Sequence, residues 1–185
     1  LNYIPRFAAQ PRLRLAWLLA VGRNSWWIMY FVYMPIQLKA SGFSVEMTGA
    51  IASLGMVPMF LVRVWAKIGK RYGIRPLLIA GYTAAGLATL AAAIAAELPM
   101  FSIALILLAA VFASVIDGAG NVPFLRAVHP YERESMTADY MTFRHSASLA
   151  TPGIFAAVLL VAPLPFVFAT SAGIAFWMAG LCRFI

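Results

Sequence analysis

The chain has 185 residues, of which 63% are hydrophobic and only 11% are charged. A soluble domain usually carries about 25% charged residues, so polar groups here are too few to cover a surface in water. The composition excludes an ordinary soluble globular protein and predicts a protein whose main surroundings are lipid. The net charge of +8 would suggest a nucleic-acid partner in a soluble protein. Here the positive charges lie at the ends of apolar runs, which is typical of membrane topology, and we expect no nucleic-acid partner.

Six apolar segments are each long enough for a helix to cross the bilayer, which takes roughly 20 residues. Backbone groups inside lipid must form hydrogen bonds within the protein, and no alternating strands of a barrel occur. We therefore predict an all-α membrane protein, with a cytoplasmic lead-in at residues 1–12 and a transmembrane bundle at residues 13–185. The predicted helices cover residues 13–38, 44–64, 76–96, 100–124, 137–161 and 165–182.

Basic residues are distributed unequally between the two ends of these helices. Eleven Lys or Arg side chains flank the end at which the first helix begins and the last helix stops, whereas only Lys39 flanks the other end. Because positively charged flanks favour the cytoplasmic side, we expect both termini to be cytoplasmic. Five of the eleven fall within residues 63–75, in a tight basic loop with Gly73 and Pro76 at its turn.

Four ionisable residues lie more than one helical turn from either end of the predicted spans, where a charge costs at least about 2.5–3.5 kcal/mol. At 1.5 Å per residue, Arg23 lies about 13 Å from Arg14 and Asp117 about 13 Å from Arg126, while Arg144 and His145 lie about 10–12 Å past Thr137, the start of their predicted helix. Three helices thus place charge at one level. Two interpretations stay open. Asp117 pairs with Arg23 or Arg144 in a polar cavity where a substrate or proton competes, or the same groups form a static clamp.

Further polar and aromatic residues accompany these charges. Arg23, Trp27 and Tyr30 follow the i, i+4, i+7 spacing of one helical face, and Asn24 adjoins Arg23. Aromatic rings beside an arginine can form a binding surface through cation–π contacts, or can simply pack between helices. Asn121 lies four residues after Asp117, so that the two can present polar groups to one cavity.

Sequence motifs of enzymes and metal sites are missing. The chain has one cysteine, Cys182, and no Gly-x-Ser-x-Gly, His-Glu-x-x-His or phosphate-binding loop motif. We expect no metal, no cofactor and no enzymatic activity. Ser146 and His145 are too close on one helix to make a persuasive catalytic pair, so an intramembrane enzyme is a minor alternative.

The stretch AKIGKRYGIRPLL, residues 66–78, resembles the signature between the second and third helices of each half of major facilitator superfamily transporters. That signature reads roughly Gly-x-Leu-x-Asp-Arg-x-Gly-Arg-Arg-Pro. Lys70 stands where the family has an acidic residue, so the gating role of that residue is not carried over. The loop PFLRAVHPYER and the opening NYIPR are also similar to connections in this family. The matching positions of the signature are Arg71, Gly73, Arg75 and Pro76.

The resemblance implies two six-helix bundles around a central cavity, each built of two inverted three-helix repeats. In this family the first, second, fourth and fifth helices of each half line the cavity, and the charges found above lie on the first, fourth and fifth. We therefore expect the C-terminal six-helix half of such a transporter, in a bacterial inner membrane or plasma membrane, whose partners are lipid, a small-molecule substrate and the missing N-terminal half.

The expected function is secondary transport of a small polar or anionic solute by alternating access, by symport or antiport. The predicted substrate-binding residues are Arg23, Asn24, Trp27, Tyr30, Asn121 and Arg144. Asp117 and His145 are expected to serve proton coupling or gating. The alternative from another class is a non-transporting membrane scaffold or assembly factor that reuses the fold.

Overall fold

The computed structural model describes Phe7 and residues 9–185. Residues 1–6 and 8, which belong to the predicted lead-in and include Arg6, lie outside the described residues. The described chain is helical and contains no strand, which confirms the predicted all-α class. The elements are α2 (Pro11–Ala40), α3 (Val45–Leu54), η1 (Val57–Leu61), α4 (Val62–Tyr72), α5 (Ile74–Ile94), α6 (Pro99–Ala119), α7 (Val122–Ala127), η2 (Pro130–Glu132), α8 (Arg133–Leu159), α9 (Pro165–Leu181) and η3 (Cys182–Phe184).

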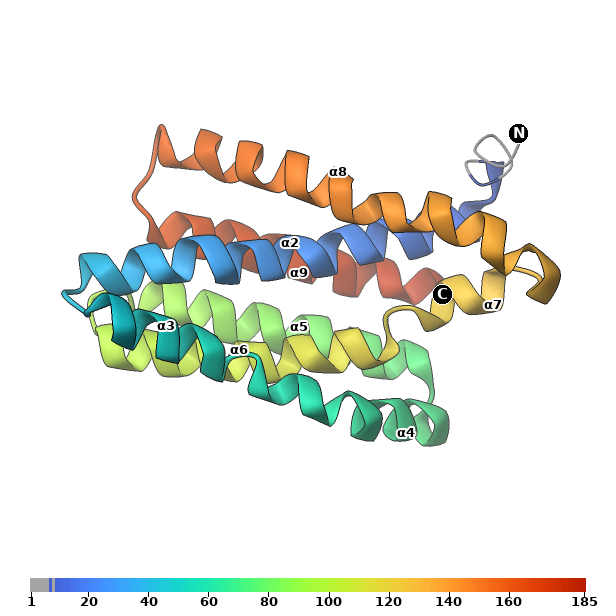
Figure 1. Ribbon diagram of the computed structural model, residues 1–185, viewed down its shortest axis with the longest axis horizontal. Helices are drawn as coiled ribbons and strands as arrows, with labels where there is room; N and C mark the ends of the chain where they lie inside the picture. The colour runs from blue at the N-terminus through green and yellow to red at the C-terminus, as the bar shows by residue number, and fades with distance from the viewer. Residues whose placement is uncertain (1–6, 8) are drawn as a thin grey trace.

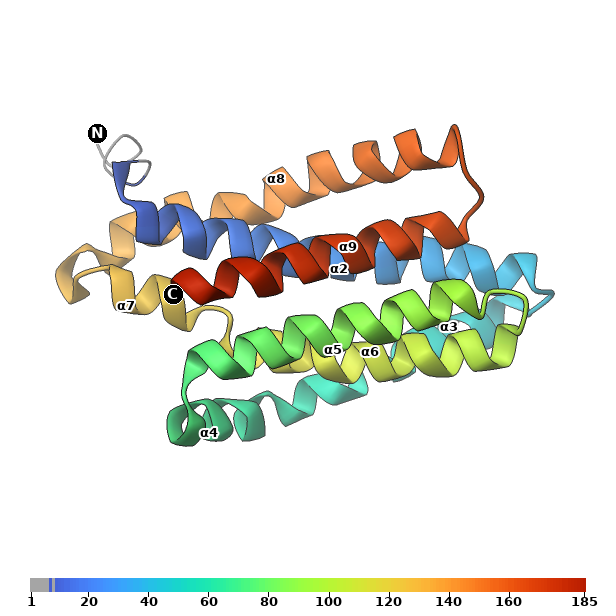
Figure 2. The same ribbon diagram turned by 180° about the vertical axis from the view of Figure 1, so that it is seen from behind.

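The long helices lie side by side along one axis (Figures 1 and 2). α2 contacts α8 and α9 as well as α3, α6 and α7, while α5 packs against α6 and α9, and α4 against α6. The start of α2, the α4–α5 junction, α7 and the C-terminus lie at one end of the bundle (Figure 1). The α2–α3, α5–α6 and α8–α9 connections lie at the other. We call the first the basic end, because it contains residues 63–75.

In the part of the chain that the structure describes, four segments are long and apolar enough to cross a membrane. This finding is compatible with the predicted membrane protein. α2 and α8, with 30 and 27 residues, are also long enough but carry more polar residues. The four segments are Val45–Tyr72, Ile74–Ile94, Pro99–Ala127 and Pro165–Phe184.

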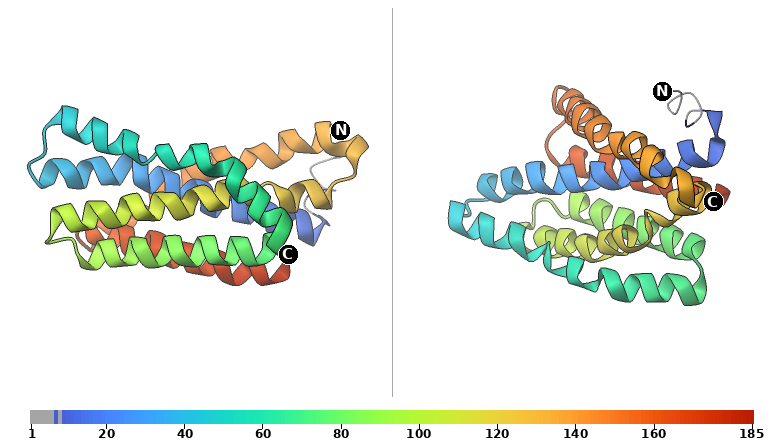
Figure 3. Two further views of the ribbon diagram at one scale, coloured as in Figure 1. Left: turned by 90° about the horizontal axis from the view of Figure 1, so that it is seen from below. Right: turned by 45° about the vertical axis from the view of Figure 1, so that its right-hand side comes forward.

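Two predicted continuous helices are interrupted, and a proline lies just beyond each break, although α2 and α8 continue through Pro35 and Pro152. A proline lacks the N–H that would bond the carbonyl four residues earlier, and its ring clashes with that carbonyl. Pro58 follows the last residue of α3 by four positions, and Pro123 has the same spacing from the last residue of α6. The predicted helix 44–64 therefore appears as α3, η1 and α4, and the predicted helix 100–124 as α6 and α7. Figure 3 shows that the α3–α4 segment is not one straight rod.

The basic loop is shorter than predicted. Only Gly73 separates α4 from α5, with a φ of 98° and a ψ of 150° that a residue with a side chain rarely adopts. Lys70 and Arg71 belong to the last turn of α4, where positive charge complements the helix dipole. Arg75 and Pro76 belong to the first turn of α5. Gly73 alone thus reverses the chain.

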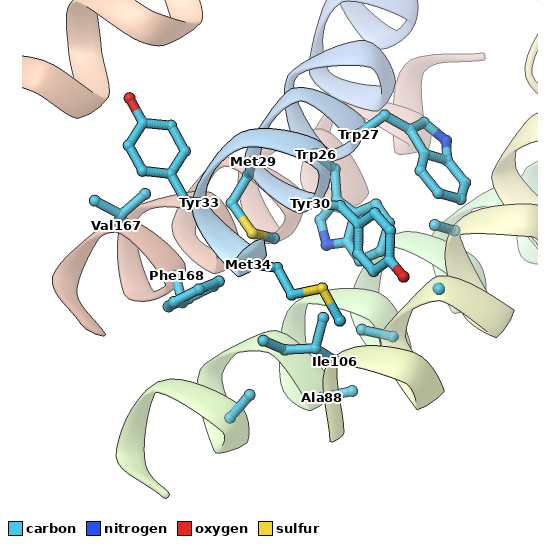
Figure 4. Packing of buried hydrophobic residues seen from close by; sticks show 14 of the residues in the cluster. Trp26, Trp27, Met29, Tyr30, Tyr33, Met34, Ala88, Ile106, Val167 and Phe168 are labelled. Atoms are coloured by element: carbon cyan, nitrogen blue, oxygen red, sulfur yellow. The ribbon is translucent and has the colours of Figure 1, made fainter. Parts of the chain in front are cut away.

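The largest buried cluster surrounds the aromatic residues of α2 (Figure 4). The Trp26 and Tyr30 rings stack with centroids 5.7 Å apart, and the Trp26 indole N–H donates to Thr89 Oγ1 at 3.0 Å. Tyr33 points the other way and meets Phe155 of α8 edge to face at 5.2 Å. Because lipid is as apolar as these side chains, close packing rather than removal from water holds such helices together. α2 is therefore the central packing element of the bundle.

Tyr30 also supplies hydrogen bonds that the break after α3 leaves open. The last four carbonyls of a helix have no partner within it. The buried hydroxyl of Tyr30 donates to the Ala52 carbonyl at 2.9 Å and lies 3.3 Å from that of Ile51. A Cβ on Gly55 would collide with the same hydroxyl. The glycine therefore lets α2 approach the broken end of α3.

We predict that Tyr30→Phe lowers the free energy of unfolding by about 1–3 kcal/mol, because it leaves partly buried carbonyls of α3 without the hydroxyl donor. Thermal unfolding of the purified protein in detergent measures the change. Tyr33→Phe is the matched control, since the Tyr33 hydroxyl makes no hydrogen bond with the described residues, and its effect should stay within about 0.5 kcal/mol. Equal effects of the two substitutions would contradict this role of Tyr30.

Candidate functional site

Arg23 lies at the centre of a polar cluster between α2, α6, α7 and α8. It occurs in the middle of α2, a largely apolar helix, and is only 8% exposed. A guanidinium group cannot lose its proton in a protein, so it needs partners wherever it is buried. Its partners come from the junction between α6 and α7 and from α8.

Asp117, near the end of α6, is the anionic partner. Its Oδ1 lies 3.4 Å from Arg23 Nε, and its Oδ2 accepts a hydrogen bond of 2.7 Å from the Trp27 indole. The exposed fractions of the two side chains are 9% for Arg23 and 18% for Asp117, so the pair is largely shielded from solvent. Trp27 lies one turn after Arg23 on α2. The same face of α2 therefore holds Asp117 at both of its oxygens.

Asn121 extends the cluster toward α8. Its Oδ1 accepts hydrogen bonds from Arg23 Nη2 at 3.1 Å and from the Tyr140 hydroxyl at 3.2 Å. Asn121 lies between the two helices that Pro123 separates, directly before the first residue of α7. The result is a continuous chain of polar contacts across the bundle, running from Trp27 through Asp117, Arg23 and Asn121 to Tyr140.

Two glycines make room for this arrangement. A Cβ on Gly120 would lie 2.5 Å from Arg23 Nη1 and 2.6 Å from the Ile116 carbonyl. A Cβ on Gly118 would lie 3.0 Å from the Val62 carbonyl of α4. Gly120 therefore admits the guanidinium group, whereas Gly118 allows α4 to approach α6. Neither position has the strand-to-helix turn that a phosphate-binding loop requires.

The remaining predicted residues divide between the cluster and its surroundings. Asn24 is half-buried beside Arg23 in sequence, and Tyr30 is fully buried against α3. Arg144 and His145 are exposed on α8. Among the described residues Asp117 forms its ion pair with Arg23, not with Arg144. Lys70, Arg71, Gly73, Arg75 and Pro76 all lie at the α4–α5 junction, at the basic end of the bundle (Figure 1).

Phe143 connects Arg144 to the cluster. The guanidinium carbon of Arg23 lies 5.4 Å from the centre of the Phe143 ring, and that of Arg144 lies 6.0 Å from it. An arginine within about 6 Å of an aromatic ring gains a cation–π attraction. Arg144 therefore contacts the ring that Arg23 also contacts, from an exposed position on α8.

Tyr140 and Phe143 are members of the cluster that the sequence did not single out. Phe124 also belongs to it, because its ring stacks on that of Tyr140 with centroids 4.1 Å apart. The available signal was the spacing of Tyr140 and Arg144, which are one helical turn apart on α8. In the sequence, Tyr140 and Phe143 look like ordinary core residues of an apolar helix. Spacing alone therefore does not identify them as members of a polar cluster.

The cluster is built around one buried cation, Arg23, whose partners are Asp117 and Asn121. Arg23 presents five N–H donors in a fixed plane, a geometry that suits carboxylate and phosphate groups. Addition of a proton to Asp117 would remove the negative charge that now holds Arg23. A bound anion and Asp117 would therefore compete for the same guanidinium group.

Comparisons with protein-family models, with curated proteins and with solved structures gave no match for this chain.

We predict that Arg23→Gln and Asp117→Asn each lower the free energy of unfolding by about 1.5–3 kcal/mol, because each leaves a largely buried charged partner incompletely bonded. The double variant should lose less than the sum of the two, with a coupling of at least about 1 kcal/mol. Thermal unfolding in detergent gives these values. Arg144→Gln combined with Asp117→Asn is the control and should be additive within about 0.5 kcal/mol. Additivity of the first pair would rule out a stabilising Arg23–Asp117 interaction.

Proposed function

We propose that this chain is a six-helix half of a major-facilitator-type secondary transporter that moves a small polar or anionic solute by alternating access. The observation that carries the proposal is the Arg23–Asp117 pair in the interior of an apolar bundle. Ionisable residues inside membrane helices are costly and commonly belong to substrate or proton pathways. The resemblance of residues 66–78 to the signature of that superfamily supports the same function.

In the proposed mechanism the solute and Asp117 alternate as partners of Arg23. An anionic group of the solute binds the guanidinium group, and a proton on Asp117 compensates for the lost pairing. Asn121 and Trp27 hold the two charged residues in position through their hydrogen bonds. Arg144 and His145, exposed on α8, would meet the solute as it enters or leaves. Coupling to protons would follow from this exchange, because the pair is more stable when Asp117 is charged.

We further propose that α2 and α8 cross the membrane together with the four more apolar segments. Their polar residues point into the cluster or toward a second bundle. The N-terminal half expected from the family would cover the exposed faces of α8 and of α3 and α4, whose described residues are mostly unburied. In this arrangement the basic end is cytoplasmic and the protein is a multi-pass component of an inner or plasma membrane.

Labelling of single cysteines tests this topology. In a Cys182→Ala background, we expect Ser41→Cys and Leu160→Cys to react with a membrane-impermeant maleimide in intact cells. Arg12→Cys and Arg133→Cys should react only after permeabilisation. All four positions are exposed, at opposite ends of α2 and α8. If both ends of either helix react in intact cells, that helix does not cross the membrane and the six-span arrangement is wrong.

Transport can be tested with the product of the complete gene reconstituted in proteoliposomes. We expect uptake of at least one of three probes, radiolabelled lactate, succinate or inorganic phosphate, to be driven by an imposed pH gradient and abolished by a proton ionophore. Arg23→Gln should lower the initial rate at least tenfold, because the anion loses its buried partner. Asp117→Asn should lower the rate of uptake driven by the pH gradient more than it lowers the rate of solute exchange measured without a gradient.

Arg63→Gln is the matched control, since it removes one positive charge from an exposed position of α4 outside the cluster. The initial rate of solute uptake by the Arg63→Gln variant should equal that of the unmodified protein. Uptake that is unchanged after neutralisation of both Arg23 and Asp117 would favour the alternative of a scaffold or assembly factor in which the pair is purely structural.

A further inference from the structure

Three arginines from three different elements line one cavity at the basic end of the bundle. Arg12 comes from the first turn of α2, Arg75 from the first turn of α5 and Arg126 from the last turn of α7. The cavity has a volume of about 390 Å³, which falls in the range of small-molecule sites. The other lining residues are apolar: Leu15, Pro123, Ala127, Phe184 and Ile185.

A second cavity, of about 790 Å³, adjoins the first and continues its basic lining. It shares Arg12 and Arg126 with the first cavity and adds His129 and Arg133. Arg133 is oriented by a hydrogen bond of 3.2 Å from its Nη2 to the Leu125 carbonyl of α7. Among the described residues no Asp or Glu lines either cavity.

Among the described residues, no acidic side chain balances the positive charge of the smaller cavity. The side chains of Arg12, Arg75 and Arg126 are exposed, and none of them forms an ion pair within the described part of the chain. Membrane topology explains why basic residues lie at this end, because they favour one side of the bilayer. It does not explain why three of them, far apart in sequence, converge on one cavity.

Two helices begin at this cavity, α2 and α5, while α7 and η3 end there, so that helix ends of both polarities line it. The start of a helix carries a partial positive charge and unpaired N–H groups, and acidic residues in the first turn normally compensate for them. α2 and α5 have no acidic residue in the first turn, and neither has a side chain that caps it. Arg12 and Arg75 occupy these turns instead. An anion bound here would compensate the three arginines and the uncapped starts of α2 and α5.

We propose that this cavity binds the phosphate group of an anionic phosphate ester, held by Arg12, Arg75 and Arg126. Guanidinium groups bind phosphate through paired hydrogen bonds. The apolar wall formed by Leu15, Pro123 and Phe184 suits an ester with a carbon skeleton better than it suits a bare ion. A phospholipid headgroup and a soluble phosphate ester share this chemistry. This site is separate from the Arg23 cluster and does not depend on the transport proposed above.

Native mass spectrometry of the purified protein in detergent tests this site, with phosphatidylglycerol as the probe. We expect one phosphatidylglycerol to be retained in preference to phosphatidylcholine, and Arg75→Gln/Arg126→Gln to weaken its binding at least tenfold. Arg63→Gln/Lys67→Gln is the matched control, because it removes two exposed positive charges of α4 outside the cavity. This control should change the affinity less than twofold.

Competition distinguishes the two sources of the phosphate group. Displacement of phosphatidylglycerol by glycerol 3-phosphate in solution would identify a site for soluble esters, and retention would identify a headgroup site on the membrane surface. Either result supports a phosphate site when the cavity variant loses binding and the control does not. Equal loss in both double variants would show attraction by net charge alone and would overturn the proposal, as would binding of none of the probes.

Discussion

A buried arginine needs partners, and this requirement relates four elements of the bundle to one another. The Arg23 side chain reaches from α2 to Asp117 on α6 and to Asn121 before α7, while Phe143 on α8 contacts its guanidinium group. In lipid there is little hydrophobic force between helices, so polar contacts and close packing have to specify how they fit together. The absence of a side chain at Gly120 is part of this specification, because it leaves space for the guanidinium group.

The same requirement acts on the backbone. Pro58 and Pro123 end α3 and α6 and so leave carbonyl groups without partners inside their own helices. At the first break the hydroxyl of Tyr30 provides the hydrogen bonds. At the second break the chain turns so that Asn121 meets Arg23. Tyr30 and Arg23, both on α2, therefore contact the two interruptions.

The buried Arg23 and the three arginines at the basic end thus have different surroundings. In the interior, Arg23 is paired with Asp117 and largely shielded from solvent. At the basic end, Arg12, Arg75 and Arg126 are exposed and form no ion pair with the described residues, which is the arrangement that the proposed anion would use. The chain separates these environments by about the depth of half a membrane helix, since Arg12 and Arg23 lie on the same α2, about 16 Å apart along its axis.

By itself, the sequence determined the helical class and singled out Arg23 and Asp117, because a charge inside an apolar run stands out without any structure. It also indicated that Arg23 and Trp27 share a face, since their spacing follows the helical period. Only the tertiary structure decided that Asp117 pairs with Arg23 and not with Arg144, and that Tyr140 joins the cluster. The physical reason is that such contacts depend on how each helix is rotated about its axis. That rotation is set by the packing of neighbouring helices and by the breaks at Pro58 and Pro123, not by spacing along the chain.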